Sequence, residues 1–400
     1  MPAEESTDLL QQIRATGLWR ADYFHSSKAL DDETGLLGGT LQLKALPSLT
    51  DRVDGKFEAR ITNSAIGASG ATRFVLLEGF ATMHFSKADV RIGKQIVAWG
   101  RADGINPTDN LTPRDYTVML PFEEDQRVGT PSVKVDAFLS QGHTVTLFAT
   151  PFFEPSKIPL PAAAGAFVEQ TPARSLSEMQ AGLKLDKSGE GHDWSISLFR
   201  GNSLLPQIAP VAGGAVQQLR YDRITAFGAD FARNYGRFGF RGEMSYIDTT
   251  DDDGTDPRIK NPYFYWIAGV DRTFFENLNV NLQFIQRRVR HFRGSESFAD
   301  PLERSTVVQN AIFNGQRDHI GNGISFRVSN QWLNETLEAE IFAALNLNHS
   351  NSFFRPLVTY AFNDHWKGTI GGELFRGPDD TPYGSLKVNR GAFAELRYAF

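Results

Sequence analysis

The sequence predicts an all-β fold, a transmembrane antiparallel up-and-down β-barrel of about 18 strands. Apolar and polar side chains alternate in segments of about ten residues, the pattern of antiparallel strands with two different faces. Tight turns and long loops also alternate along the chain, which indicates short periplasmic turns and long extracellular loops. Because this rhythm runs through residues 14–400, we expect a single transmembrane barrel, preceded by a periplasmic lead-in at 1–13.

The individual strands follow from the alternation. Leu278, Val280 and Leu282, for example, alternate with Asn279 and Asn281. The alternation is lost at 286–291, where we expect a β-bulge. The expected strands are 15–25, 39–48, 55–63, 72–85, 88–99, 130–140, 143–153, 178–187, 192–201, 219–233, 236–248, 262–274, 277–290, 318–329, 335–346, 352–362, 365–376 and 386–400.

Composition excludes several classes of protein. The chain contains 31 Phe and no Cys, so disulfides and thiolate metal sites are ruled out. Its net charge of −6 shows no basic excess, and we expect no nucleic-acid partner. No run of about 18 apolar residues is present, so a transmembrane helix is not expected. The N-terminus has neither a basic region nor an apolar stretch, and we expect a mature form from which the signal peptide is absent.

Two segments carry a family resemblance. The last ten residues, Gly391–Phe400, end in Phe and place an apolar residue at every second position back from it. This segment resembles the terminal strand of bacterial outer-membrane barrels. The resemblance implies insertion into the outer membrane of a Gram-negative bacterium, with membrane lipid and lipopolysaccharide as surroundings. Ile92–Gly100, IGKQIVAWG, is similar to the G-R-Q…W-G strand of porin-like and alginate-export-like barrels, with Lys94 in place of Arg.

Charged residues on the strands provide a check on this register. A charge facing lipid at the bilayer midplane would cost about 2–4 kcal/mol, so the polar parity should face the lumen. The basic residues assigned to the lumen are Arg20, Lys44, Lys56, Arg60, Arg91, Lys134, Lys184, Arg241, Arg327, Arg355, Lys367 and Arg397. The acidic ones are Asp22, Glu58, Glu78, Asp89, Asp136, Asp230, Glu243, Asp271, Glu338, Glu340, Glu373 and Glu395. The two sets are similar in size, which predicts weak ion selectivity from the wall alone. The charges either pair across strands or form a ladder that orders a passing solute.

The connection at 100–129 is the best candidate for a constriction. Loops of this length are usually functional or disordered. It follows Trp99, which we expect near the outer rim, and its apolar residues Met119, Leu120 and Phe122 need a surface to pack on. This favours a loop folded inward over a solvated surface loop. Its candidate pore residues are Arg101, Asp103, Asp109, Arg114, Asp115, Glu123, Glu124 and Arg127, together with Arg91, Lys134, Asp136, Arg241, Glu243, Glu338 and Glu340 on the flanking and facing walls.

Two other loops, 158–168 and 204–214, are unexpectedly apolar. Exposed apolar surface usually marks a binding site. The two loops pack on each other or cover the barrel mouth, or else they bind a protein partner or an apolar or amphipathic substrate at the outer mouth.

Motifs for catalysis are missing from the sequence. There is no Walker loop, G-x-S-x-G or H-E-x-x-H motif, and the His residues form no recognisable arrangement with Ser or paired Asp. The acidic stretch 251–256 has oxygen ligands that suit Ca²⁺, but it lacks the ligand spacing of an EF-hand and is expected to be a solvated loop. We therefore expect no enzymatic activity, no catalytic residues, no metal and no cofactor.

The sequence thus predicts an outer-membrane channel for passive diffusion of small hydrophilic or charged solutes through a charge-lined constriction. A second hypothesis remains open. The barrel would then be the outer-membrane component of a multi-protein export or conduit system, with a polysaccharide, a lipid or a partner protein threaded through it or docked on it.

Overall fold

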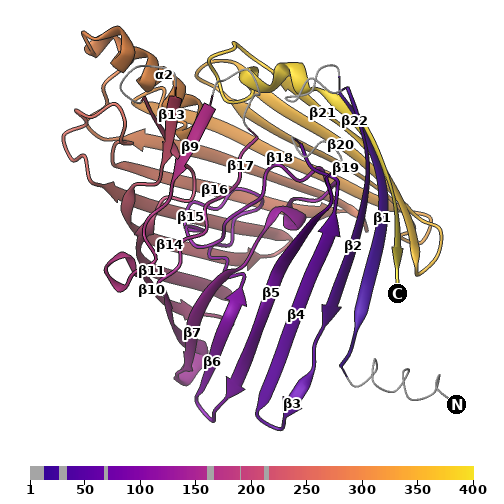
Figure 1. The fold of residues 1–400 in the computed structure, drawn as a ribbon. Coiled ribbons are helices and arrows are strands. Elements are labelled where there is room, and N and C mark those ends of the chain that lie inside the picture. The colour runs from indigo at the N-terminus through magenta and orange to yellow at the C-terminus, as the bar shows by residue number, and fades with distance from the viewer. Residues whose placement is uncertain (1–12, 27–33, 67–70, 160–165, 190, 211–215) are drawn as a thin grey trace, which may run out of the picture.

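The computed structural model describes residues 13–26, 34–66, 71–159, 166–189, 191–210 and 216–400, and the predicted all-β barrel is confirmed. Eighteen of the described strands pair antiparallel with their neighbours, and β22 pairs with β1 to close the ring (Figure 1). The ring consists of β1 (Thr16–Ser26), β2 (Gly35–Ala45), β4 (Val53–Thr62), β5 (Arg73–His84), β6 (Ala88–Gln95), β7 (Thr130–Phe138), β8 (His143–Thr150), β10 (Gln180–Lys187), β11 (His192–Asn202), β14 (Arg223–Tyr235), β15 (Phe238–Thr249), β16 (Tyr263–Phe274), β17 (Leu278–Val289), β18 (Ile320–Trp332), β19 (Leu337–Asn346), β20 (Asn351–Ala361), β21 (Trp366–Arg376) and β22 (Gly391–Ala399).

Smaller elements lie outside the ring. The three-residue strand β3 (Ser48–Thr50) pairs with β4 in a short turn. In the long loops, β9 (Ala166–Gln170), β12 (Gln207–Pro210) and β13 (Val216–Arg220) form a separate sheet beside helix α2 (Pro301–Asn314). Figure 1 shows α2, β9 and β13 together at the end of the barrel away from the two termini. Among the described residues, no helix is long and apolar enough to cross a bilayer.

The barrel wall buries polar side chains and exposes apolar ones. On β15, Met244 is 54% exposed, whereas its neighbour Glu243 is 3% exposed. On β17, Leu282 is 48% exposed and Gln283 only 1%. This reversal of the usual burial follows from the strand period of two, which sends successive side chains to opposite faces. The outward face is therefore the apolar one, as in barrels that lie in a bilayer.

The register differs from expectation at two places. The predicted bulge at 286–291 is wrong, because β17 keeps continuous register with both β16 and β18. The alternation fails there because Gln286 and Arg288, which lie toward the long-loop rim, occupy the outward parity. A bulge occurs instead in β5, where Leu77 has no partner between the pairs Glu58–Glu78 and Ala59–Leu76. The ends of two strands also differ from those expected. β6 ends at Gln95, and the 3₁₀ helix η6 (Gly384–Asn389) precedes β22.

Replacing Met244 with Arg should test the outward face. A charge at this mid-barrel position is expected to lower the free energy of unfolding in lipid vesicles by about 2–4 kcal/mol. Met244→Leu is the matched control and should change that free energy by less than about 1.5 kcal/mol. Equal stabilities of the two variants, measured by reversible chemical unfolding in vesicles, would contradict a lipid-facing Met244.

Candidate functional site

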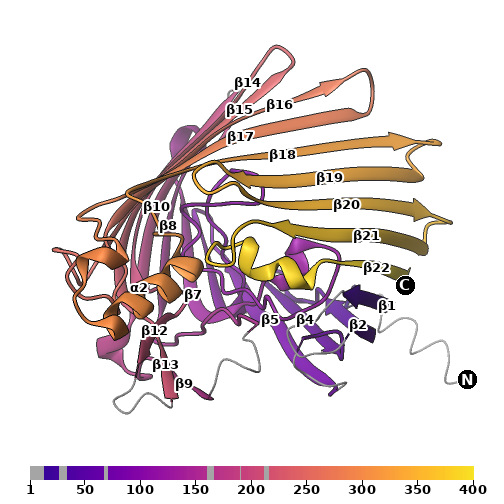
Figure 2. The same ribbon diagram turned by 90° about the horizontal axis from the view of Figure 1, so that it is seen from above.

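The connection between β6 and β7, residues 96–129, lies inside the ring of strands in both views (Figures 1 and 2). We call it the inner loop. Its first residues carry an apolar anchor. Trp99 is buried together with Val97 and Leu111 against lumen-facing apolar residues of the wall, Phe148, Phe199, Ile224, Ala226 and Ile247. Burying a large aromatic ring against such a patch stabilises the start of the loop. These apolar side chains occupy lumen-facing positions, which are otherwise mostly polar, and the patch was not predicted from the sequence.

Glu243 of β15 holds the next segment of the loop. One carboxylate oxygen accepts hydrogen bonds from the backbone N–H groups of Arg101 and Ala102 at 3.0 Å and from Asn106 Nδ2 at 3.3 Å. The other accepts from the Thr108 N–H and Oγ1, both at 2.8 Å. A charged acceptor makes stronger hydrogen bonds than a neutral one. Gly100 has φ +98°, and a Cβ there would meet the Glu243 carboxylate, so this close approach requires glycine.

Ion pairs extend this attachment along the wall. The Arg101 guanidinium binds Asp230 of β14 and, at 2.8 Å, Asp186 of β10. Arg241 donates to the Arg101 carbonyl at 3.2 Å and pairs with Asp271 of β16. The segment that follows the apolar anchor is therefore fixed by charged groups from three strands, β10, β14 and β15.

The loop also touches a second part of the wall. Arg327 of β18 pairs with Asp103 of the loop at 3.0 Å and with Glu340 of β19 at 2.7 Å. Its guanidinium lies 5.1 Å from the ring centroid of Phe342, within cation–π range. Arg327 thus joins the loop to the β18–β19 wall.

A third contact lies at the short 3₁₀ helix η1 (Glu123–Gln126). Arg20 of β1 donates to both carboxylate oxygens of Asp125, at 2.6 and 3.1 Å, and Arg60 of β4 donates to the Asp125 carbonyl at 2.8 Å. Arg20 also lies 3.6 Å from Glu395 of β22. Nearby, Met119 packs beside the lumen-facing rings of Phe24 and Phe393. The pairing is largely buried, so removing one partner alone would leave an uncompensated charge.

Contacts within the loop and with Arg73 and Lys157 outside it shape the middle of the loop. Asp115 accepts from the Thr117 N–H at 3.1 Å and lies 3.4 Å from Lys157 and 3.8 Å from Arg73. Arg114 and Arg127 face each other in an antiparallel β-bridge.

Asp109 stands out electrostatically in the same region. Burial raises the pKa of Asp109 to about 6, although Arg127 and Arg114 act to lower it. One of its carboxylate oxygens has no hydrogen-bond partner in the described structure.

The predicted pore residues therefore separate into two groups. Three of the loop residues reach the wall. Arg101 contacts Glu243, Asp103 pairs with Arg327, and Asp115 lies 3.8 Å from Arg73 of β5. Other wall residues pair locally, Lys134 with Asp136 at 2.6 Å and Glu338 with Gln331 at 3.3 Å, while Arg91 contacts Thr82 and the Phe80 ring. Two wall residues contact the loop or its partner: Glu340 pairs with Arg327, and Arg241 donates to the Arg101 carbonyl. On the loop, Glu123 is the first residue of η1, and Glu124 is exposed.

Contacts that the site prediction omitted come from Arg20, Arg60, Asp186, Asp230 and Arg327. The sequence shows lumen parity for all five, including Asp186, which lies two residues after Lys184 in the expected strand 178–187. Nothing in a single sequence says which wall residue meets the loop, since these pairs are more than 60 residues apart.

The apolar loops are only partly described. Residues 160–165 and 211–215 lie outside the described ranges. In the described part, Ile208 and Ala209 of β12 are buried, and Asn310 of α2 exchanges hydrogen bonds with the Ile208 backbone at 2.7 and 3.0 Å. In the acidic stretch 251–256, Asp251 accepts from the Asp256 N–H, and Asp256 pairs with Arg258. Within the described residues, no three His, Asp or Glu side chains are placed to hold a metal.

The fold is that of the porin-like outer-membrane barrels. OccAB4 of Acinetobacter baumannii superimposes with a TM-score of 0.58 at 9% identity, over 96% of this chain and 97% of that one. A mutant of the Rh. blastica porin aligns over 96% of this chain and 99% of its own, with a TM-score of 0.46 and 12% identity.

The chain belongs to the family described as "Protein of unknown function (DUF1302)", whose model matches residues 51–287. No curated protein is significantly similar to it. The similarity to alginate-export-like barrels remains a prediction.

Glu243 offers a direct test of the loop attachment. Glu243→Ala should leave the donors of Arg101, Ala102 and Thr108 without their acceptor, at a cost of about 1–3 kcal/mol for a buried unsatisfied group. Amide hydrogen exchange at these three residues is expected to accelerate by at least tenfold. Glu338→Gln, on the wall away from the loop, is the matched control and should leave the exchange unchanged. Unaltered exchange in Glu243→Ala would show that the other contacts alone order the segment.

Asp109 predicts a pH effect on stability. Its folded-state pKa of about 6 lies above the ordinary value of 3.8, so the folded protein binds the extra proton between these pH values. Stability should therefore fall as pH rises from about 4 to 6. Asp109→Asn lacks this titration and should gain about 1–3 kcal/mol relative to wild type at pH 7. Unfolding curves at pH 4 and 7 measure the difference, and a gain that does not depend on pH would contradict the assignment.

Proposed function

We propose that this protein is an outer-membrane channel through which small hydrophilic or charged solutes diffuse passively. The inner loop would be the constriction of its single barrel. The observation that carries the proposal is the attachment of one loop to three parts of the wall, at Glu243, Arg327 and Arg20. A loop fixed across a lumen narrows it and places charged groups where a solute must pass.

Location in the outer membrane is supported by the outward apolar face and by the barrel's short turns and long loops. The resemblance of Gly391–Phe400 to terminal strands of outer-membrane barrels agrees with it. The channel needs no bound energy source, because diffusion follows the solute gradient. The conduit hypothesis is less well supported, since the described part of the 204–214 loop is buried against α2 rather than open to a partner.

Conductance in planar bilayers tests the proposal. The purified protein should give a steady ion current, and replacing residues 101–126 with a short Gly-Ser linker should raise that current severalfold. Shortening the acidic loop by removing 252–255 is the control and should leave the current unchanged.

A wild-type protein that conducts nothing until residues 101–126 are removed would overturn the proposal. It would instead favour a closed barrel that needs a partner to open.

A further inference from the structure

The charges of the lumen wall are unevenly paired. Most basic side chains there have a carboxylate partner within 4.0 Å, as in Lys56 with Glu58 and Glu78, Lys134 with Asp136, and Lys184 with Asp186. Lys44, Lys367 and Arg397 differ, because no ion pair, hydrogen bond or ring contact joins them to another described residue. These three lie on β2, β21 and β22, which together with β1 form the closing seam of the barrel.

The strand register places like charges side by side at this seam. Lys367 is directly opposite Arg397, and Arg397 is directly opposite Arg20. All three side chains face the lumen, because Arg20 reaches Asp125 of the inner loop and directly opposed residues share a face. Like charges directly opposite each other are destabilising in a sheet. Arg20 pairs with Asp125 and Glu395, whereas no described carboxylate lies within 4.0 Å of the charged group of Lys367 or Arg397.

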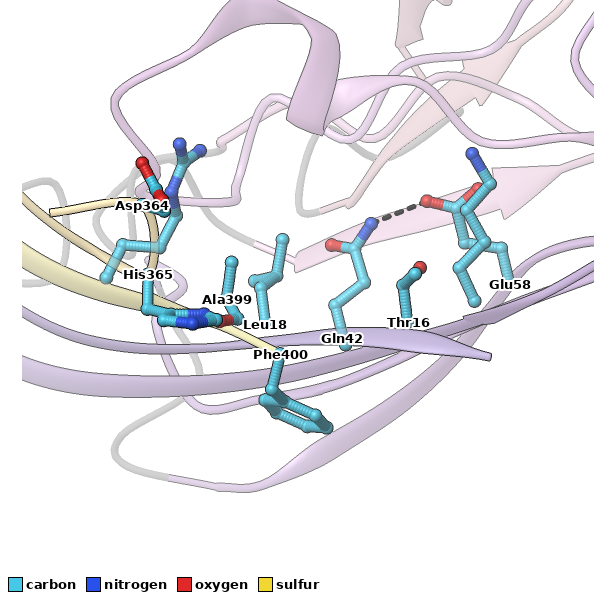
Figure 3. Close-up of a pocket in the computed structure, with 11 residues that line it drawn as sticks. Thr16, Leu18, Gln42, Glu58, Asp364, His365, Ala399 and Phe400 are labelled. Carbon is cyan, nitrogen blue, oxygen red and sulfur yellow. Dashed lines mark hydrogen bonds between the residues drawn. The ribbon is translucent and has the colours of Figure 1, made fainter. Parts of the chain in front are cut away.

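A hollow of about 470 Å³ opens beside this row at the short-turn mouth of the barrel (Figure 3). Arg397 and Lys44 line it, together with His365, whose Nδ1–H donates to the Ala399 carbonyl at 2.8 Å. Its apolar part comes from Leu18 and Phe400. The hollow is large enough for a small solute and is lined by two cations that lack a carboxylate partner among the described residues.

Two carboxylates also line the hollow, and neither neutralises these cations. Glu58 stands opposite Lys44 in register but is held by Gln42 at 2.6 Å, the contact drawn in Figure 3, and by Lys56 at 3.0 Å. Asp364 is exposed in the turn between β20 and β21, and no ion pair within 4.0 Å joins it to a described basic group.

We propose that Lys44 and Arg397, which line the hollow, bind an oxyanion, the carboxylate or phosphate group of a solute, at the short-turn mouth. Lys367, opposite Arg397 in register, adds positive charge beside them. The inference rests on the proposed channel function and gives it a substrate class. A bound oxyanion supplies the negative charge that the cross-strand row lacks, and basic side chains in a pore favour anions over cations. Most other charges of the wall are paired, so the rest of the wall contributes little selectivity of its own.

The test uses planar bilayers with a KCl gradient. The sign of the wild-type reversal potential should show that the channel prefers anions to cations. The triple variant Lys44→Gln, Lys367→Gln, Arg397→Gln should lose that preference severalfold. The control neutralises three exposed cations on short turns of the same rim, Arg52→Gln, Lys87→Gln and Arg237→Gln, and should keep the wild-type preference.

Acetate and inorganic phosphate, titrated separately from the short-turn side, identify the preferred group by which of them reduces the chloride current. Two results would overturn the site while leaving the channel proposal intact: neither anion reduces the chloride current, or wild type and the triple variant have equal reversal potentials. A protein that conducts nothing would instead contradict the channel proposal.

A second measurement does not depend on conductance. In detergent at low ionic strength, phosphate or acetate should raise the melting temperature of wild type but not of the triple variant. The triple variant should itself melt higher than wild type without added anion, because the like-charge repulsion has been removed. A similar shift in wild type and the triple variant would count against the site.

Discussion

The closing pair of strands β1 and β22 is the constraint on which the rest of the structure depends. A sheet in a bilayer has no water to satisfy its edges, so it has to close. Closure fixes the register between Arg20 and Arg397 and gives every strand one face toward the lumen. The polar parity of the sequence then becomes an inner surface dense in charge, and any loop that enters it has to be held by charged groups.

The inner loop is attached by different chemistry along its length. Trp99 uses apolar burial, Glu243 collects backbone N–H groups, and Asp125 receives two arginines from opposite sides of the β1–β4 wall. The attachments at Glu243 and Asp125 use charged groups, whose desolvation is costly unless they are paired. Asp109 is the exception, since one of its oxygens lacks a partner and burial raises its pKa. The loop is consequently ordered by its contacts with the wall more than by internal secondary structure, of which η1 is a single short turn.

Much of the fold could be predicted from the sequence, because a period of two is a local signal and eighteen repetitions of it reinforce one another. Helix α2 was missed although its signals are present, with Asp300 capping Leu302, Pro301 in the first turn and Gly315 in the left-handed region at φ 66°. These signals lie between the expected strands 277–290 and 318–329, a segment that the alternation of tight turns and long loops predicts as a long loop. The sequence predicts no role for the inward-facing Phe148 and Phe199. They are apolar residues at positions where the alternation places polar ones, and their role follows only from the position of Trp99, which packs against them.

The lumen charges show where prediction from a single sequence stops. Parity assigned basic and acidic residues to the inner face and suggested a balance between them. Balance in number says nothing about pairing, which depends on register across strands far apart in the chain. Lys134 and Asp136 neutralise each other within one strand, whereas Lys367 and Arg397 meet across two strands and have the same sign. A wall that is neutral on average can therefore carry a local positive region. That region lies at the seam where the two ends of the sheet meet, and its register is fixed by closure rather than by any local turn.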